Sequence, residues 1–423
     1  MRWAFICAGL VAGCTIWPAL ATGETLEEAW QTALAVDQRI QAAREKVAAA
    51  NSSVEAAQRG YRPSITNETG YMYLTNDLSF DFKGDSYRIL NNELATTSLM
   101  AKMPIYTGGR ITSAVDAASC LSNVAGSNVE RTTLDTKLAV VVTYLTVLRA
   151  QRGMEVARSN VLSLEAQEKV VKTMLERGEV PRNDLLAVQV ELANARQDVI
   201  RADNELANAR AAYNRLLRRP LDNPVELAEL QLPETSGPPE PLIEQGLQMR
   251  PELAVLAAQA NALRHQATSE RAATKPQLGV EGGLLYLESP GIDPNTFGTF
   301  MFGLEWTPYD GGVARAKANS LLSEASSIAR TRSDMTEAIR LDIQNAWRDE
   351  QESRKRIELA TKAIEQAEEN LRVAKVRFQK GAAINTEVLD AESLRTRSYN
   401  KYYDAIYEAV LATFRLRRAV GSL

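Results

Sequence analysis

Two carboxylates in the C-terminal part of the chain have the spacing best suited to ion chemistry. Glu387 and Asp390 are three residues apart, so on a helix both project from one face. Acids on one face, repeated around an axis by several copies of a chain, form rings that attract cations and repel anions. Acids in the first turn of a helix are also favoured by the helix dipole alone. Both interpretations stay open on these residues alone.

The chain offers little for catalysis or metal binding. Its single histidine is His265, and its three cysteines are Cys7, Cys14 and Cys120. The sequence contains no Ser–His–Asp set, Cys–His pair, metal-binding cluster or phosphate-binding loop. We therefore predict no enzyme activity, no cofactor and no bound metal, with His265 a surface or seam residue and Cys120 a packed thiol. The net charge of −4 argues against a nucleic-acid partner.

The N-terminus is typical of an export signal. Arg2 precedes an apolar run from Trp3 to Trp17, and small residues lead up to Ala21. We predict a signal peptide over residues 1–21. The segment that ends in Val-Ala-Gly-Cys14 also resembles a lipobox, which would leave Cys14 lipidated as the first mature residue. We favour cleavage after Ala21, because the apolar run continues past Cys14 and a helix starts soon afterwards.

The two acids belong to a stretch that the chain carries twice. Each copy reads as a long helix ended by a glycine, a short polar turn, and a second helix. The glycines, Gly178 and Gly381, are 203 residues apart, and so are Gly108 and Gly311 in two Gly-Gly turns upstream. Two landmarks with one separation indicate an internal duplication.

The two copies differ at the acids. Asp184 corresponds to Glu387, but the position that corresponds to Asp390 holds an alanine. Only the second hairpin therefore carries both acids. We expect Asn183 and Thr386 to cap the helices that follow the two turns.

Hydrophobic periodicity predicts the elements around these turns. Residues 26–61 repeat every seven positions with small residues between, which is typical of one helix in close coiled-coil packing. A helical pattern without proline runs over residues 110–177 and would be about 100 Å long. We divide the mature chain into a first repeat over 22–219, a connector over 220–240 and a second repeat over 241–423. Each repeat contains a helix, two strands and a long helical hairpin.

Alternating segments predict the strand pairs, over residues 64–105 and 276–307. Residues 76–92, inside the first pair, are polar and rich in turn-forming types, so we expect a surface loop there. The strands alternate apolar with polar or small residues, as transmembrane barrel strands do, although soluble half-buried hairpins alternate in the same way. The apolar positions on one side include Leu99, Ala101, Met103 and Ile105 in the first pair, and Phe300, Phe302, Leu304 and Trp306 in the second.

Four strands cannot close a membrane barrel, and open sheet edges are not tolerated in lipid. No internal segment is apolar enough to cross a membrane as a helix. The expected fold is therefore mainly α with a transmembrane β part. Long coiled-coil hairpins would combine with four strands per protomer, and three protomers would form a shared 12-stranded β-barrel and a periplasmic α-barrel.

The duplicated order of elements, the Tyr-Thr-Gly-Gly109 and Tyr-Asp-Gly-Gly312 turns and the two glycine-led hairpin tips together resemble the TolC-like outer-membrane efflux protein family. The resemblance covers essentially the whole mature chain. It implies a passive homotrimeric channel-tunnel, located in the outer membrane and extending into the periplasm. Such a channel is the exit duct of a tripartite efflux or type I secretion system. The implied partners are a periplasmic adaptor, an inner-membrane transporter and outer-membrane lipid.

The resemblance also implies roles for residues at the tips. Glu387 and Asp390 match acids of the family's periplasmic aperture. In some members a basic residue two positions after the second tip glycine helps to lock the closed state. Here that residue is Ala383, which puts the lock in doubt, and Arg182 or Lys380 are only guesses for its replacement. The candidate adaptor contacts lie in the tips, 178–184 and 381–387, and include Gly178, Asn183, Asp184, Gly381 and Thr386.

A second function also fits the sequence. The chain could be a soluble periplasmic coiled-coil scaffold or adaptor whose strand pairs form a small soluble domain. Fractionation with the outer membrane would favour the channel, and a wholly soluble protein would favour the scaffold.

Overall fold

The computed structural model describes residues 23–76, 78–90, 92–288 and 293–423. The predicted signal peptide, with Cys7 and Cys14, lies outside the described residues. Among the described helices, none combines the length and the apolarity needed to cross a membrane.

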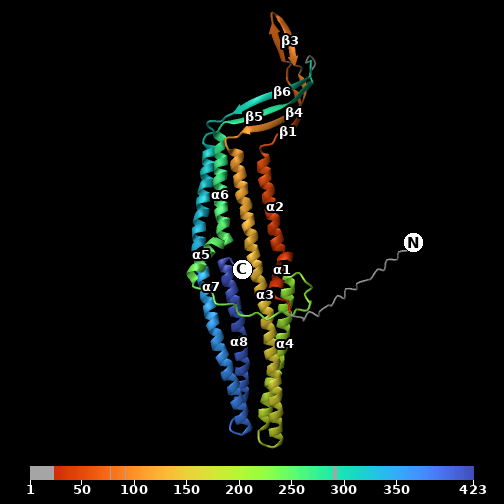
Figure 1. Cartoon of the computed structure of the whole chain (residues 1–423). Helices are drawn as coiled ribbons and strands as arrows, with labels where there is room; N and C mark the ends of the chain where they lie inside the picture. Colours follow the sequence, from red (N-terminus) through yellow and green to blue (C-terminus); the bar gives the residue numbers. More distant parts are fainter. Residues whose placement is uncertain (1–22, 77, 91, 289–292) are drawn as a thin grey trace, which may run out of the picture. The chain divides into compact units, whose positions relative to one another are not determined.

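The secondary-structure elements follow one order twice (Figure 1). Two 67-residue helices, several shorter helices and a smaller number of strand residues confirm the predicted mainly α fold with a β part. The first half contains α1 (Leu26–Val36), α2 (Gln38–Arg59), β1 (Ser64–Tyr73), β2 (Leu78–Phe82), β3 (Asp85–Leu90), β4 (Glu93–Tyr106), α3 (Arg110–Glu176) and α4 (Arg182–Leu216). The second half contains α5 (Pro239–Met249), α6 (Pro251–Arg271), the short 3₁₀ helix η1 (Ala272–Thr274), β5 (Gln277–Glu288), β6 (Thr296–Glu305), α7 (Val313–Gln379) and α8 (Asn385–Val420).

The packing of the chain defines two compact units. Among the described residues, the helical unit comprises 23–36, 139–234 and 352–411. The sheet unit comprises residues 37–138, 235–351 and 412–423. Each unit takes segments from both halves of the sequence.

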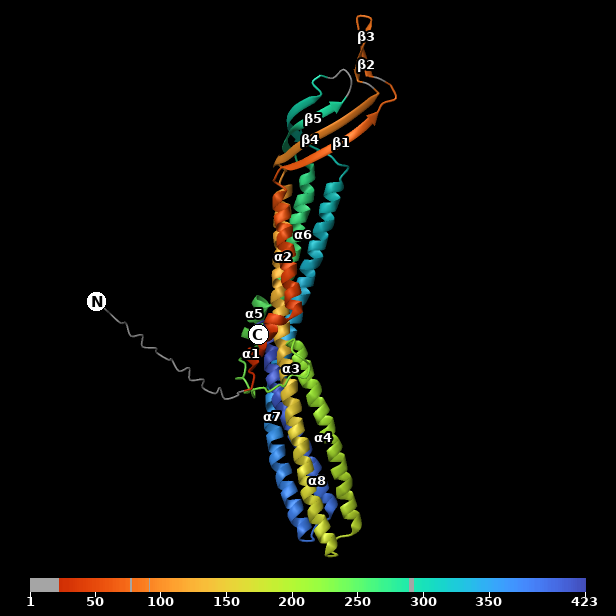
Figure 2. The same cartoon turned by 90° about the vertical axis from the view of Figure 1, so that its right-hand side faces the viewer.

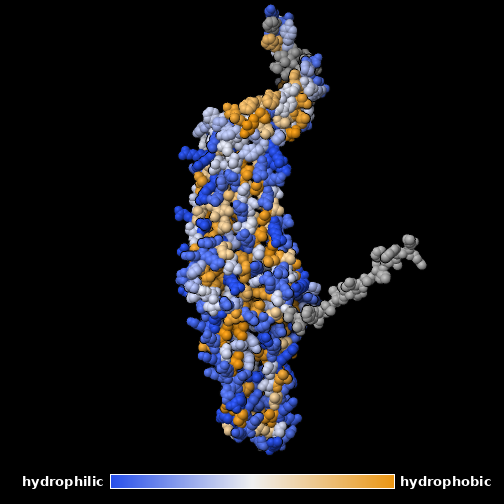
Figure 3. All heavy atoms as spheres, in the orientation of Figure 1, coloured by the Kyte–Doolittle hydropathy of each residue, from blue (hydrophilic) through white to orange (hydrophobic). Residues whose placement is uncertain are grey.

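The sheet unit contains a four-stranded antiparallel sheet with the order β1-β4-β5-β6. In its register Ala101 lies opposite Gly282, which lies opposite Phe300, so these residues share one face. The predicted apolar positions that pair in the register fall on this face, where Phe300 is 81% exposed and Phe302 is 62% exposed. Ile105 lies at a bulge of β4, and Trp306 follows the end of β6. Figure 3 shows hydrophobic side chains gathered over the strands. The sheet therefore presents a face of large apolar side chains that remain exposed among the described residues.

The expectation of a surface loop over residues 76–92 was wrong. This segment contains a second sheet, the two-stranded ribbon β2–β3 (Figure 2). Lys83 and Gly84 connect its strands with φ angles of 54° and 97°. Two residues with positive φ form the tight turn that matches the twist of a hairpin. The alternation Leu-Ser-Phe-Asp-Phe before this turn, which the turn-forming residues around it obscured, supplies the strand pattern.

The helix predicted over residues 26–61 is interrupted. It breaks at Asp37, whose φ and ψ of −67° and 117° are extended, and whose carboxylate accepts a hydrogen bond from the Arg39 N–H. The same break recurs 213 residues later at Arg250, with φ and ψ of −69° and 116°. Pro251 explains the second break, because a proline disfavours helical conformation in the residue before it. In the first half Asp37 takes the same conformation as an N-cap.

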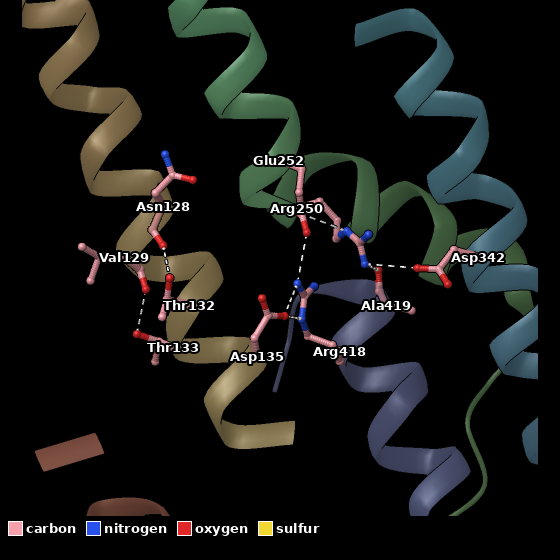
Figure 4. Close-up of polar contacts among 10 residues, drawn as sticks. All are labelled: Asn128, Val129, Thr132, Thr133, Asp135, Arg250, Glu252, Asp342, Arg418 and Ala419. Carbon is pink, nitrogen blue, oxygen red and sulfur yellow. Dashed lines mark hydrogen bonds and ion pairs between the residues drawn. The ribbon is translucent and has the colours of Figure 1, made fainter. Parts of the chain in front are cut away.

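A charged network surrounds the second break, within the sheet unit (Figure 4). Arg418 of α8 lies 2.7 Å from an oxygen of Asp135 on α3 and 3.1 Å from an oxygen of Glu252 on α6. Arg250 contacts Glu252 and Asp342, each at 3.2 Å. Arg418, Arg250 and Glu252 are mostly buried. Removing one of them would leave its partners as uncompensated charges in a poorly solvated site.

Candidate functional site

The two hairpin turns of the helical unit have the same backbone geometry. Gly178 and Gly381 have positive φ angles of 76° and 70°, which glycine adopts without strain. The next N–H in each turn, from Glu179 or Ala382, donates to the carbonyl five residues earlier at 2.9 and 2.8 Å. These bonds satisfy carbonyls at the helix end, as in a Schellman motif. Both turns lie at the same end of the helical unit (Figures 1 and 2).

Both predicted caps lie inside the helices that they were expected to precede. Asn183 is the second residue of α4, and Thr386 is the second residue of α8. Pro181 stands at the N-cap of α4 with φ and ψ of −78° and 157°, and it makes no side-chain capping bond. In α4 a proline therefore stands at the cap, where the sequence predicted a polar residue, and its fixed φ suits the start of a helix.

A buried amide joins the two hairpins. Asn385, the first residue of α8, is 2% exposed. Its side-chain oxygen accepts from Gln167 Nε2 of α3 at 3.0 Å, and its nitrogen donates to the Asp184 carbonyl of α4 at 3.2 Å. An apolar cluster with members from all four helices of the hairpins, including Val171, Val188, Phe378 and Val388, lies in the same region.

A buried carboxylate makes a second link between the hairpins. Glu392 of α8 accepts from the Ser163 hydroxyl of α3 at 2.8 Å. Lys375 of α7 lies 3.4 Å from the same carboxylate oxygen, and Arg395 lies 2.6 Å from the other. Sequence reasoning missed both Asn385 and Glu392, because their partners on α3 are more than 200 positions away.

Glu387 and Asp390 both line a groove of about 420 Å³ on the α7–α8 hairpin. Two guanidinium groups, those of Arg377 and Arg397, line it as well. Arg377 Nη1 lies 3.0 Å from Glu387 Oε2, and its Nη2 donates to the Ala382 carbonyl at 3.1 Å. The groove thus combines two acids with two bases. Its charge is nearly balanced in a single chain.

Arg377 is the basic residue that sequence reasoning did not find. Arg182 and Lys380 were the guesses for a lock, and neither forms an ion pair in the described part of the chain. Arg377 precedes the tip glycine by four residues, one helical turn. A glycine-ended hairpin returns the chain toward that last turn, so its position beside Glu387 follows from the turn itself.

The remaining candidates have structural surroundings. His265 of α6 is half-buried, with Nδ1 3.7 Å from Asp116 Oδ2. Burial raises the pKa of the Cys120 thiol, as does the nearby Asp116 carboxylate. The described residues contain no group of three or more His, Cys, Asp or Glu side chains arranged to hold a metal ion. At the end of the sheet Trp306 and Tyr309 are exposed, and the Trp306 indole donates to the Thr274 carbonyl at 3.2 Å.

Solved structures of outer-membrane channels have the same fold. CusC, whose crystal structures describe folding and transmembrane channel formation, matches with a TM-score of 0.81 at 17% identity, covering 94% of this chain and 92% of that one. The outer-membrane protein VceC of Vibrio cholerae matches with a TM-score of 0.80 at 15% identity, covering 94% and 96%. The outer-membrane channel MtrE of Neisseria gonorrhoeae, solved in its open state, matches with a TM-score of 0.76 at 16% identity, covering 95% and 89%.

The fold is therefore that of an outer-membrane channel protein. The family model for outer membrane efflux proteins matches residues 29–217 and 242–422, and the chain belongs to that family. No protein with a curated description matches the chain.

Proposed function

We propose that three copies of this chain form a passive channel through the outer membrane, the exit duct of a tripartite efflux or type I secretion system. The main support for this proposal is the four-stranded sheet. Its edge strands β1 and β6 have one neighbour each in the described chain, and unpaired edges do not persist in lipid. Three copies joined edge to edge would supply twelve strands, more than the eight of the smallest membrane barrels.

The two faces of the sheet support the same arrangement. One face carries the exposed apolar residues, including Phe300, Phe302 and Leu304. The opposite face carries Lys102 directly across from Glu281. An apolar face toward lipid and a polar face toward a water-filled lumen is the pattern of membrane barrels. The alternative function, a soluble scaffold, does not explain what would cover the apolar face.

The hairpin turns are the proposed docking site for a periplasmic adaptor, which would connect the channel to an inner-membrane transporter. Gly178, Asn183, Gly381 and Thr386 are exposed, and Asp184 is half-buried, so most of the tip surface is free in one chain. Membership of the outer membrane efflux protein family supports this assignment. The helical unit would then lie in the periplasm.

We further propose that Glu387 and Asp390 form acidic rings at the periplasmic aperture. Arg377 would take the place of the missing lock at Ala383, because it ties Glu387 to the turn of its own hairpin. In the closed state the ion pair would neutralise one of the two rings. Helix N-terminal stabilisation remains the simpler role for these acids if their removal leaves conduction unchanged.

Planar-bilayer recording on the purified mature protein tests the channel directly. We expect discrete conductance steps from a stable trimer that fractionates with the outer membrane. A well-folded protein found only in the soluble periplasm, with no current in the bilayer, would refute the channel and support the scaffold.

A further inference from the structure

A pocket of about 630 Å³ lies on the polar face of the four-stranded sheet, within the sheet unit. The end of α2, the start of α3 and strands β1, β4, β5 and β6 all contribute to it. Two glycines, Gly279 and Gly303, face each other across β5 and β6 in its lining. A Cβ added at Gly303 would meet nothing within 4 Å, so the pocket is open above the strands. The charged residues that line it are Arg59, Arg62, Lys102, Arg110, Glu281 and Glu305.

Three of the cations in the pocket have no ion-pair partner within the described residues. Arg59 is paired with Glu55, one turn earlier on α2. No ion pair joins Arg62, Lys102 or Arg110 to a carboxylate in the part of the chain that the structure describes. Three unpaired cations against two carboxylates leave an excess of one positive charge per chain.

The second repeat shows that the fold does not require two of these cations, Lys102 and Arg110. Positions 203 residues after Lys102 and Arg110, in the same strand–turn–helix segment, hold Glu305 and Val313. The position 213 residues after Arg62 holds another basic residue, Lys275. At the positions of Lys102 and Arg110, the same backbone is thus built once with basic residues and once with an acidic and a neutral one. Lys102 and Arg110 therefore need an explanation other than folding.

We propose that Arg62, Lys102 and Arg110 form a basic vestibule that binds the anionic group of a transported solute. The ligand class is an organic anion bearing a carboxylate or a phosphate. Arginine donates in a planar fork that matches both groups, and lysine adds a point charge. The inference rests on the proposed channel, in which the polar face of the sheet lines the lumen. Repeated in three chains, the vestibule forms a ring with net positive charge that raises the local concentration of anions.

The acids in the pocket do not cancel this effect. Glu281 lies directly opposite Lys102 in the sheet register, so it acts mainly on that one lysine. Arg62 and Arg110 come from the helix side of the pocket, where α2 ends and α3 begins. An anion can therefore meet two guanidinium groups, which together with Lys102 outnumber the two carboxylates of the lining, Glu281 and Glu305.

The test replaces the vestibule with the residues that the second repeat already carries. The Lys102→Glu/Arg110→Val variant copies Glu305 and Val313, which the same backbone accommodates. The control is Arg44→Val/Lys46→Glu, which makes the same change in charge at exposed positions of α2 outside the pocket. The reversal potential of each channel under a KCl gradient gives its chloride-to-potassium permeability ratio. The variant makes the vestibule more negative by three unit charges per chain, and a single unit charge at contact distance in water already changes occupancy by about fivefold. We therefore expect the ratio to fall by at least about fivefold in the vestibule variant.

Inorganic phosphate provides a second readout on the same channels. It should reduce the current through the wild-type channel and through the control, but not through the vestibule variant. Equal permeability ratios and equal phosphate effects in all three channels would overturn the vestibule while leaving the channel intact. Absence of current from the wild type would refute the channel, and the vestibule with it. If the double variant fails to insert, the milder Arg62→Gln and Lys102→Gln variants must each lower the ratio, and no change in either overturns the proposal.

Discussion

Replacing Arg377 with glutamine changes the charge of the hairpin groove and leaves the fold of the hairpin intact. In the structure Arg377 contacts the Glu387 carboxylate at 3.0 Å and the Ala382 carbonyl at 3.1 Å. Glutamine keeps much of the side-chain volume and removes the positive charge. The variant therefore leaves Glu387 without its partner at the proposed aperture.

The structural cost of Arg377→Gln is small. The ion pair joins side chains that are 52% and 44% exposed, and such pairs contribute at most about 1 kcal/mol. The bond to the carbonyl contributes about 1 kcal/mol more. Together these fall well short of the roughly 5–15 kcal/mol that stabilises a folded domain. We expect the trimer to form.

The expected effect of Arg377→Gln on ion selectivity is larger than its effect on stability. Two acids and two arginines line the groove, so the variant gains one net negative charge per chain. A unit charge about 4 Å from a passing ion changes its energy by about 1 kcal/mol in water. That energy corresponds to about a fivefold change in occupancy. We expect the potassium-to-chloride permeability ratio to rise by about this factor.

The assay is the reversal potential in a planar bilayer, with Arg372→Gln as the matched control. Arg372 lies on the same helix, is paired with Glu369 and does not line the groove. An equal rise in both variants would mean that overall charge, and not the groove, sets selectivity. No rise in Arg377→Gln, with the trimer intact, would refute the idea that Glu387 faces the ion path.

Three further predictions follow from buried or exposed groups. Asn385→Ala should lower the free energy of unfolding by about 1–3 kcal/mol, because it leaves Gln167 unpaired, whereas Asn183→Ala at an exposed position should change it little; equal denaturant midpoints would contradict the link between hairpins. Burial raises the pKa of Glu252, but its own backbone N–H and the nearby guanidinium groups outweigh burial and hold the pKa below the ordinary value. Its stabilisation is thus present above the usual glutamate pKa and lost as pH falls through the lower folded value. Acid titration of thermal stability should show this loss in the wild type and not in Glu252→Gln; identical acid profiles would exclude it. Phe300→Asp should abolish bilayer insertion without unfolding the helices, since a charge on the lipid face is costly, and normal insertion would show that this face does not meet lipid.

Most of the fold could be predicted because its patterns are long and regular. The helical pattern over residues 110–177 gave the bounds of α3 to within one residue. The exceptions are short. The ribbon β2–β3 occupies thirteen residues in which turn-forming types mask the alternation. The break at Asp37 left a signal only in the other repeat, where Pro251 follows Arg250 at the same separation.

The candidate site could be predicted only in part, because its partners are distant in sequence. The shared face of Glu387 and Asp390 follows from their spacing, and both do line one groove. The partner of Glu387 lies across the turn, and the partners of Asn385 lie on the other hairpin. Helical periodicity says which side of a helix is buried. It does not say which residue of another helix a buried amide will meet.

The duplication suggests why charge differs where backbone does not. The two helix breaks share their dihedral angles, yet one places Asp37 beside Arg39 and the other places Arg250 beside Glu252. In a trimer of the proposed kind, two similar repeats per chain give a wall with six nearly equivalent segments. A charge present in both repeats would make a sixfold ring, and a charge confined to one repeat makes a threefold ring. Asp390 on the second hairpin and Lys102 and Arg110 of the first-repeat vestibule are each confined in this way, whereas Glu387 is matched by Asp184 and Arg62 by Lys275. Charged residues could therefore change in one repeat while the other repeat preserved the geometry of the wall. Ion selectivity could then evolve without loss of the fold.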